Sequence, residues 1–238
     1  NFFCNNPYIN LYNSPSINSK ISSQIVYGEK FKILKKAKNF IKIITFYDRY
    51  PGYIKNKKFI KKFKPTHKVK ILKTRIYKSN NFLPFSSEIE ILKRKKNYVM
   101  FEKNKWIKQK DITLINKKEK NFVKIFKSYL NCKYKWGGKT HNGVDCSALV
   151  QLFYKFNNKF FPRDTIDQIR YKKGNSTKKK FKLGDIIYWK GHVAICINSK
   201  TLIHAYGPKK KVVIMPIKET IKRIEKTANL KVIKVCRI

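Results

Sequence analysis

Residues 134–153 constrain the fold of this chain more than any other stretch, because a cysteine there lies where a glycine-rich loop becomes a helix. The loop passes through Asp145, Cys146 and Ser147 into a segment with apolar residues at helical spacing. Those apolar residues are Leu149, Leu152, Phe153 and Phe156. We therefore predict a helix that begins near Cys146. Free backbone N–H groups and the helix macrodipole would lower the pKa of this thiol and make it a nucleophile. The alternative is a buried cysteine that merely starts a core helix.

Two histidines follow in a segment that reads as a β-hairpin. Residues 192–197 and 201–205 are apolar and strand-like, and residues 198–200 are polar. If those three residues form the loop, Ala194 lies opposite His204, and His192 and His204 become neighbours on one sheet face. A bulge or a two-residue loop would break this parity. Either histidine alone is more often structural. A cysteine followed by two histidines, however, gives the order of a nucleophile, a base and a residue that orients the base.

In this order, the motifs resemble the NlpC/P60 family of cell-wall cysteine peptidases over roughly residues 119–238. The matching pieces are Tyr134, Trp-Gly-Gly at 136–138, Gly-Val-Asp-Cys-Ser at 143–147, Phe-Pro-Arg-Asp-Thr at 161–165, Leu-Gly-Asp at 183–185, Gly-His-Val-Ala-Ile at 191–195 and Ile-His at 203–204. One departure is Ala148, where the family usually has glycine. The resemblance implies an α+β fold with a papain-like catalytic domain, in which helices pack on an antiparallel sheet.

The resemblance also implies roles for residues around the cysteine. Cys146 would attack the amide, His192 would act as base, and His204 would fix its tautomer. Tyr134 and the N–H of Cys146 would stabilise the oxyanion; the alternative for Tyr134 is a core aromatic. Asp145 and Ser147 would hold the free α-amine of the substrate, although Asp145 also suits a helix N-cap.

Two further residues of this region are considered for the cleft. Thr165 would line it. Arg163 would meet a substrate carboxylate, or pair with Asp164 or Asp185. We expect no cofactor and no metal.

The N-terminal half reads as short strands joined by turns, which favours small β-barrels. Residues 1–62 resemble a bacterial SH3 domain. The features that match are Gly28-Glu29, an aromatic strand and the turn at 48–54. Residues 66–115 are predicted to form a second SH3-like domain, with one irregular β-domain as the alternative. The catalytic domain would span residues 119–238. The resemblance implies that the first SH3 domain walls the cleft through Glu29 and Tyr50.

Secondary structure in the last part of the chain is predicted from its apolar pattern. We expect a helix at 119–131, a polar loop at 172–180, a short helix at 219–226 and a last strand at 230–235. The helices should lie on one side of the sheet.

The charge is extreme, with 57 Lys and Arg against 13 Asp and Glu, a formal +44. Such charge suits a polyanion binder. However, the lysines are spread along the whole chain and accompany Ile, Asn, Phe and Tyr, which all have AT-rich codons. We therefore expect compositional bias and no nucleic-acid partner.

Five cysteines without paired spacing indicate free thiols. We expect a cytoplasmic monomer without a transmembrane segment; a periplasmic or secreted location is the alternative if a signal peptide was removed.

The predicted function is a cysteine endopeptidase that cuts the γ-D-glutamyl-diamino acid bond of peptidoglycan stem peptides, or muropeptides, with a free N-terminal L-Ala. One alternative is a non-catalytic cell-wall-binding protein. Another is an amidase or acyltransferase on the same papain-like scaffold, whose members usually lack SH3 domains. A nucleic-acid binder is the third.

Overall fold

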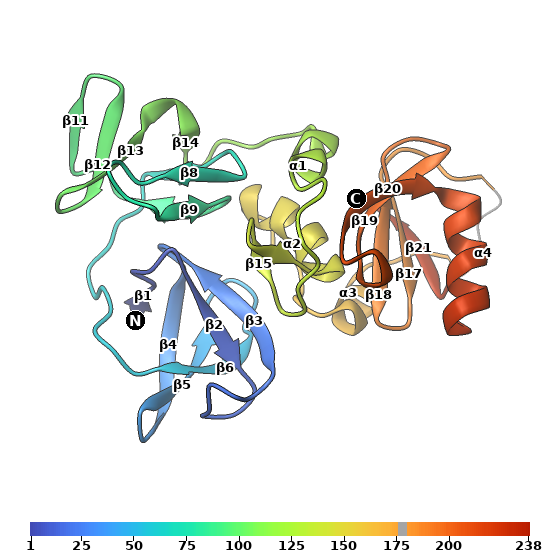
Figure 1. Ribbon diagram of the computed structural model, residues 1–238, viewed down its shortest axis with the longest axis horizontal. Helices are drawn as coiled ribbons and strands as arrows, with labels where there is room; N and C mark the ends of the chain where they lie inside the picture. Colours follow the sequence, from blue (N-terminus) through green and yellow to red (C-terminus); the bar gives the residue numbers. More distant parts are fainter. Residues whose placement is uncertain (176–179) are drawn as a thin grey trace.

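The structure is a computed structural model that describes residues 1–175 and 180–238. Figure 1 shows two β-rich units, drawn in blue and green, beside a third unit in which helices flank a sheet. Helix α2 lies between the β-rich units and this sheet. The expected class, an α+β catalytic domain preceded by two small β domains, is confirmed.

The first unit is one six-stranded antiparallel sheet with the order β1-β4-β5-β6-β2-β3. Its fully buried core includes Leu11, Phe31 and Ile41. The strands are β1 (Phe2–Phe3), β2 (Tyr8–Tyr12), β3 (Ile21–Val26), β4 (Lys30–Ala37), β5 (Phe40–Thr45) and β6 (Pro51–Lys55).

The second unit has shorter strands in three small sheets, with the orders β10-β7-β14, β11-β12-β13 and β8-β9. Its core also contains Tyr27 of the first unit, so the two pack together. The strands are β7 (His67–Val69), β8 (Lys73–Arg75), β9 (Phe82–Pro84), β10 (Glu88–Ile89), β11 (Lys93–Lys95), β12 (Tyr98–Glu102), β13 (Lys105–Lys108) and β14 (Ile112–Leu114), with a 3-10 turn at Gln109–Asp111. The domain limits at 62, 66, 115 and 119 stay predictions.

The third unit is built on a five-stranded antiparallel sheet with the order β20-β19-β18-β17-β21. Its strands are β17 (Asp185–Trp189), β18 (His192–Cys196), β19 (Thr201–Tyr206), β20 (Lys211–Pro216) and β21 (Lys234–Arg237), and a small ladder joins β15 (Lys139–Thr140) to β16 (Gly143–Val144). The helices are α1 (Phe122–Ser128), α2 (Cys146–Phe156), α3 (Thr165–Tyr171) and α4 (Ile217–Ala228), with a 3-10 turn at Gly207–Lys209.

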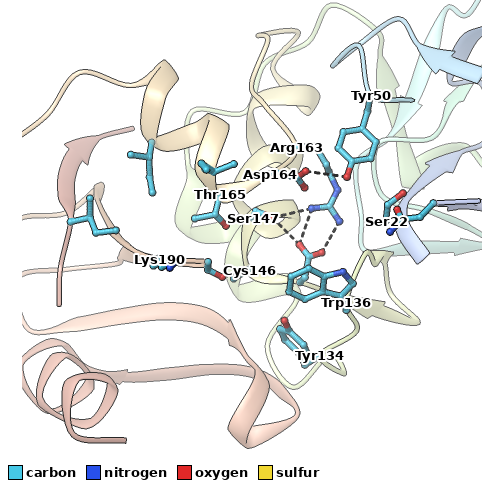
Figure 2. A pocket seen from close by; sticks show the side chains of 16 residues that line it. Ser22, Tyr50, Tyr134, Trp136, Cys146, Ser147, Arg163, Asp164, Thr165 and Lys190 are labelled. Carbon is cyan, nitrogen blue, oxygen red and sulfur yellow. Dashed lines mark hydrogen bonds and ion pairs between the residues drawn. The ribbon is translucent and has the colours of Figure 1, made fainter. Parts of the chain in front are cut away.

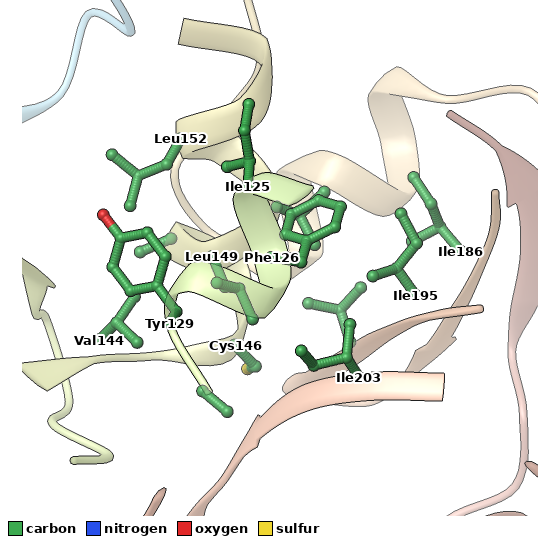
Figure 3. Packing of buried hydrophobic residues seen from close by; sticks show 14 of the residues in the cluster. Ile125, Phe126, Tyr129, Val144, Cys146, Leu149, Leu152, Ile186, Ile195 and Ile203 are labelled. Carbon is green, nitrogen blue, oxygen red and sulfur yellow. The ribbon is translucent and has the colours of Figure 1, made fainter. Parts of the chain in front are cut away.

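Helices cover both faces of this sheet, so the expectation of helices on one side was wrong. Ile186, Ile195 and Ile203 pack with α1 and α2 in one core (Figure 3). Ile187 and Ile224 belong to a second core, formed between the opposite face and α4. Every residue of β17 is buried, and a strand buried on both sides needs cover on both.

Several element limits differ from the predicted ones. Helix α1 is shorter than 119–131, because Asn121 caps it by accepting a hydrogen bond from the N–H of Lys124 at 3.1 Å. The last strand, β21, begins at Lys234, later than expected. The expected polar loop at 172–180 lies partly outside the described residues. Among the residues that are described, no helix is long and apolar enough to cross a membrane.

The first unit is held against the third by buried polar contacts. The N–H of Lys139 donates to Oε1 of Gln24 at 2.7 Å, and Nε2 of Gln151 donates to Oδ2 of Asp48 at 2.9 Å. The loop before β15 approaches β3 so closely that a β-carbon on Gly137 would lie 2.8 Å from the carbonyl oxygen of Ile21. Gly137 also has a φ of +72°, which favours glycine. This packing places β3 and the β5–β6 turn beside the start of α2.

Candidate active site

Helix α2 begins at Cys146, as predicted, because Asp145 caps it. The Oδ1 atom of Asp145 accepts a hydrogen bond from the N–H of Ala148 at 2.8 Å. The apolar residues that follow fix the helix on the sheet, and Leu149 and Leu152 are almost fully buried. Cys146 itself is only 5% exposed. The nucleophile candidate is therefore held rigidly at the first turn of a buried helix.

The pKa of the Cys146 thiol is raised to about 12, so the expected lowered pKa was wrong. Burial is the main cause, and the neighbouring carboxylate of Asp145 adds to it. The N–H groups of Val193 and Ser147 act in the opposite direction but do not outweigh burial. The thiol is thus neutral at pH 7 in the free protein.

Cys146 lies at the turn that leads into His192. Its Sγ atom is 4.0 Å from the carbonyl oxygen of Gly191, and it interacts with the N–H of Val193. The residues on either side of His192 in the chain therefore both contact the sulfur. His192 itself does not line the cavity described below.

The two histidines are joined directly, as the hairpin parity predicted. The N–H of Ile197 donates to the carbonyl of Thr201 at 3.0 Å, which leaves residues 198–200 as the loop. The register pairs Ile195 with Ile203 and, continued by one position, places Ala194 opposite His204. Nε2 of His192 lies 2.8 Å from Nδ1 of His204.

His204 is fully buried, and its surroundings favour one tautomer. Its Nε2 lies 3.4 Å from Sδ of Met215, a weak acceptor, and its ring stacks on Tyr206 with centroids 4.6 Å apart. If Nε2 keeps the proton, Nδ1 of His204 accepts from Nε2–H of His192. Nδ1 of His192 is then unprotonated and can act as a base.

Both imidazoles are neutral at pH 7. Burial lowers the pKa of His192 to about 4. Burial, with added repulsion from His192 and Lys209, lowers that of His204 to about 2. A neutral pair is what a proton acceptor and its orienting partner require.

Arg163 pairs with Asp145, a partner that the sequence did not suggest. Its Nη1 and Nη2 donate to Oδ1 and Oδ2 of Asp145 at 3.0 and 2.6 Å, and Nη1 also donates to Oγ of Ser147 at 2.9 Å. Nε donates to Oγ of Ser23 in the first unit at 3.0 Å. Of the two suggested partners, Asp185 is instead bound by Arg237 at 2.8 Å. The charge of Asp145 is therefore already neutralised.

A cavity of about 560 Å³ opens beside Cys146. Figure 2 shows the predicted residues that line it, with Tyr50 entering from the first unit. Six residues that the sequence analysis considered for the cleft share this cavity with Cys146: Tyr50, Tyr134, Asp145, Ser147, Arg163 and Thr165. Burial and the nearby groups of Cys146 and Asp145 raise the pKa of Tyr134, so its hydroxyl stays protonated and can donate.

Glu29 does not line this cavity, which corrects its predicted role. It is 3% exposed and lies 3.3 Å from Nζ of Lys139 and 3.0 Å from Nζ of Lys155. Oε2 also accepts from the N–H of Val26 at 2.7 Å. Glu29 thus joins the first unit to the third. In the sequence it is an acidic residue that follows Gly28 in a predicted turn, and nothing there indicated that it would be buried.

Trp136, Asp164 and Lys190 are among the cavity residues that the sequence analysis missed. Trp136 is 66% exposed at the rim. Oδ2 of Asp164 accepts a hydrogen bond from the Tyr50 hydroxyl at 3.0 Å, across the two units. Lys190 lies in the β17–β18 turn. The sequence held a signal for each. Trp136 belongs to the Trp-Gly-Gly motif, Asp164 follows Arg163 directly, and Lys190 lies two positions before His192.

Comparisons with known proteins agree with this architecture. Residues 131–228 match the NlpC/P60 family model, and residues 11–59 match the model of the bacterial dipeptidyl-peptidase SH3 domain. A crystal structure of an NlpC/P60 family protein from Bacillus cereus superposes with a TM-score of 0.82 at 19% identity, covering 99% of this chain and 98% of the other. That likeness shows the fold.

Two curated relatives cover most of the chain. The gamma-D-glutamyl-L-lysine dipeptidyl-peptidase of Bacillus subtilis is 25% identical, covering 84% of this chain and 77% of the relative. Dipeptidyl-peptidase 6 of Lysinibacillus sphaericus is 22% identical, covering 82% and 84%. This chain therefore contains an NlpC/P60 domain at residues 131–228, and a bacterial SH3 domain at residues 11–59 precedes it.

Proposed function

We propose that this protein is a cysteine peptidase that hydrolyses the γ-D-glutamyl-diamino acid bond of peptidoglycan stem peptides with a free N-terminal L-Ala. The observation that carries the proposal is the site itself. A buried thiol at a helix start lies at the turn before His192, whose imidazole is joined to a second buried imidazole at 2.8 Å. The names of the two curated relatives support the reaction class.

In the proposed reaction, the resting pair is a neutral thiol and a neutral imidazole. The thiol proton moves to Nδ1 of His192 as the sulfur bonds to the γ-carbonyl carbon of the substrate. His192 then gives the proton to the leaving amine, and the C–N bond breaks. Water, deprotonated by His192, attacks the thioester and releases the acid and the thiol. With pKa values of about 12 and 4, the proton moves most readily in concert with attack.

Two donors are proposed to stabilise the tetrahedral oxyanion. One is the N–H of Cys146 at the start of α2, where backbone N–H groups are free of intrahelical partners. The other is the hydroxyl of Tyr134, whose pKa is raised partly by the adjacent sulfur, which indicates that the two groups are close.

The shape of one end of the cavity supports the proposed requirement for a free amine. Tyr50, from the first unit, donates to Asp164 and so walls one end. Asp145 and Ser147 face this end, but Arg163 already neutralises Asp145. We therefore propose that Asp164 supplies much of the negative charge for the substrate ammonium, with Ser147 as a polar neighbour. Thr165 lines the same cavity.

Two of the three alternatives have less support than the peptidase. Amidases and acyltransferases on this scaffold usually lack SH3 domains, and a match to such a domain is present here. A non-catalytic wall binder has no need of a cysteine beside a joined histidine pair.

The test is incubation of L-Ala-γ-D-Glu-diaminopimelate with the wild type, with Cys146→Ala and with Cys132→Ala, which removes a thiol that does not line the cavity. Mass spectrometry should detect L-Ala-γ-D-Glu with the wild type and with Cys132→Ala, but not with Cys146→Ala. An N-acetylated peptide should resist cleavage. Equal release by all three proteins would end the assignment of Cys146.

A further inference from the structure

The cavity carries four charged side chains, of which two cancel. Asp145 and Arg163 form a bidentate pair. The other two are Asp164, which accepts a hydrogen bond from the Tyr50 hydroxyl, and Lys190, which forms no ion pair within the described residues. Figure 2 shows Lys190 on one side of Cys146 and Tyr50, which binds Asp164, on the other. The cavity is therefore negative toward one end and positive toward the opposite end.

Lys190 is positioned beside the reacting sulfur by the turn between β17 and β18. Trp189 pairs with His192 in the ladder, so Lys190 and Gly191 alone form the turn. The carbonyl of Gly191 lies 4.0 Å from Sγ of Cys146. Within residues 1–175 and 180–238, Lys190 has no hydrogen bond or ion pair, and its side chain is exposed. A bound anion would meet an ammonium that has no competing partner there.

The wall next to Lys190 is aliphatic. The N–H of Ile233 donates to the carbonyl of Tyr188 at 2.8 Å, two positions before Lys190 in the chain. Ile169 belongs to the same wall, because its carbonyl accepts from Nζ of Lys234 at 2.7 Å. That ammonium also donates to the carbonyl of Lys172 at 3.0 Å, so backbone groups occupy it. The ligand therefore meets an apolar wall that ends at one available cation.

We propose that Lys190 selects the residue on the leaving side of the scissile bond, favouring a diamino acid whose side chain ends in a carboxylate over lysine. This proposal rests on the proposed function, which places the substrate amine near Asp164 and the leaving residue beyond Cys146. The side chain of diaminopimelate would lie along Ile169 and Ile233 and bring its terminal carboxylate to Lys190. Lysine brings only an ammonium, which Lys190 repels. The bound substrate would exclude part of the solvent, so the ion pair between this carboxylate and Lys190 should be stronger than a fully exposed ion pair.

The α-carboxylate of the leaving residue could also meet Lys190, and substrate choice separates the two cases. L-Ala-γ-D-Glu-meso-diaminopimelate and L-Ala-γ-D-Glu-L-Lys share that α-carboxylate and differ at the side-chain end. If Lys190 bound only the shared group, removing its charge would slow both peptides equally. If Lys190 binds the side-chain carboxylate, removing its charge would change the ratio of the kcat/KM values for the two peptides.

The experiment measures kcat/KM for both peptides with the wild type, Lys190→Met, Lys190→Glu and Lys200→Met. Lys200→Met is the matched control, because Lys200 is also exposed in a hairpin loop of the same sheet but does not line the cavity. We expect the wild type to favour the diaminopimelate peptide about tenfold. Lys190→Met should bring the ratio near one, Lys190→Glu should favour the lysine peptide, and Lys200→Met should keep the wild-type ratio.

Binding gives a second measure that does not depend on turnover. In a Cys146→Ala background, titration calorimetry with each intact peptide should give a lower Kd for the diaminopimelate peptide than for the lysine peptide. Adding Lys190→Met should make the two Kd values nearly equal. An unchanged ratio in Lys190→Met, or equal losses for both peptides, would overturn the specificity proposal and leave the proposed function standing. Failure of the wild type to cut either peptide would overturn the proposed function and this proposal together.

Discussion

Replacing Glu29 with glutamine would remove the carboxylate that Lys139 and Lys155 share in the interface between the first and third units. The three side chains are almost fully buried, with Nζ atoms 3.3 and 3.0 Å from Oε1. Burial raises the pKa of Glu29, but the two lysines and the N–H of Val26 outweigh it and hold the pKa at about 2, against 4.5 when free. Losing one partner of such a group leaves uncompensated buried charge.

The size of the effect follows from this pKa. A pKa lowered from 4.5 to about 2 corresponds to roughly 3 to 4 kcal/mol of folding free energy at pH 7. Burial lowers the pKa of Lys139 despite Glu29, so burying the ammonium groups offsets part of that gain. We therefore expect Glu29→Gln to lower the free energy of unfolding by about 3 kcal/mol, which matches the usual cost of breaking a buried pair.

Urea denaturation, followed by tryptophan fluorescence and circular dichroism together, would measure this loss. The matched control is Glu225→Gln on the exposed side of α4, which should change the unfolding free energy by less than about 0.5 kcal/mol. The folded pKa is depressed, so the stabilisation is complete above about pH 4.5 and is lost as the pH falls through about 2. The part of the stability difference that depends on this charge should shrink to about 1 kcal/mol at pH 3. A difference below about 1 kcal/mol at pH 7, or one that grows toward pH 3, would refute this reasoning.

Three further predictions concern the site. Because His192 must be neutral to accept a proton and its pKa is lowered to about 4, kcat/KM should fall only as the pH drops through about 4; a fall centred near pH 6.5 would contradict this. Tyr134→Phe should lower kcat by about 100- to 1,000-fold with little change in thermal stability, as loss of one oxyanion donor does, and an unchanged kcat would exclude that role. Gly137→Ala should lower the melting temperature more than Gly191→Ala, because both have positive φ but only the former brings a β-carbon within 2.8 Å of Ile21; scanning calorimetry would compare them.

The sequence predicted those parts of the site that depend on local periodicity. The helix start at Cys146 followed from its apolar spacing and its capping aspartate. The contact between His192 and His204 followed from strand parity and a three-residue loop. Both arguments need only a few neighbouring residues and elementary geometry.

What the sequence could not show depends on contacts between distant segments. The sequence suggested Asp164, the next residue, or Asp185, on a strand, as the partner of Arg163. Its partner in the structure is Asp145, which the fold brings next to it. The raised pKa of Cys146 comes from burial by the sheet, which outweighs the local effect of the helix start. The burial of Glu29 with two lysines likewise becomes visible only when the units are packed together.

Tyr50 reaches the cavity from a unit that carries neither the thiol nor the histidines. Under the proposed function, the groups that break the bond and the residue that limits how much peptide can enter are thus encoded in different parts of the gene. A substitution in the turn between β5 and β6 could lengthen the accepted peptide while the sulfur and its imidazoles stay in place. Under the proposed function, such a protein would change from trimming free peptide ends to cutting within longer strands, without any alteration to its catalytic helix.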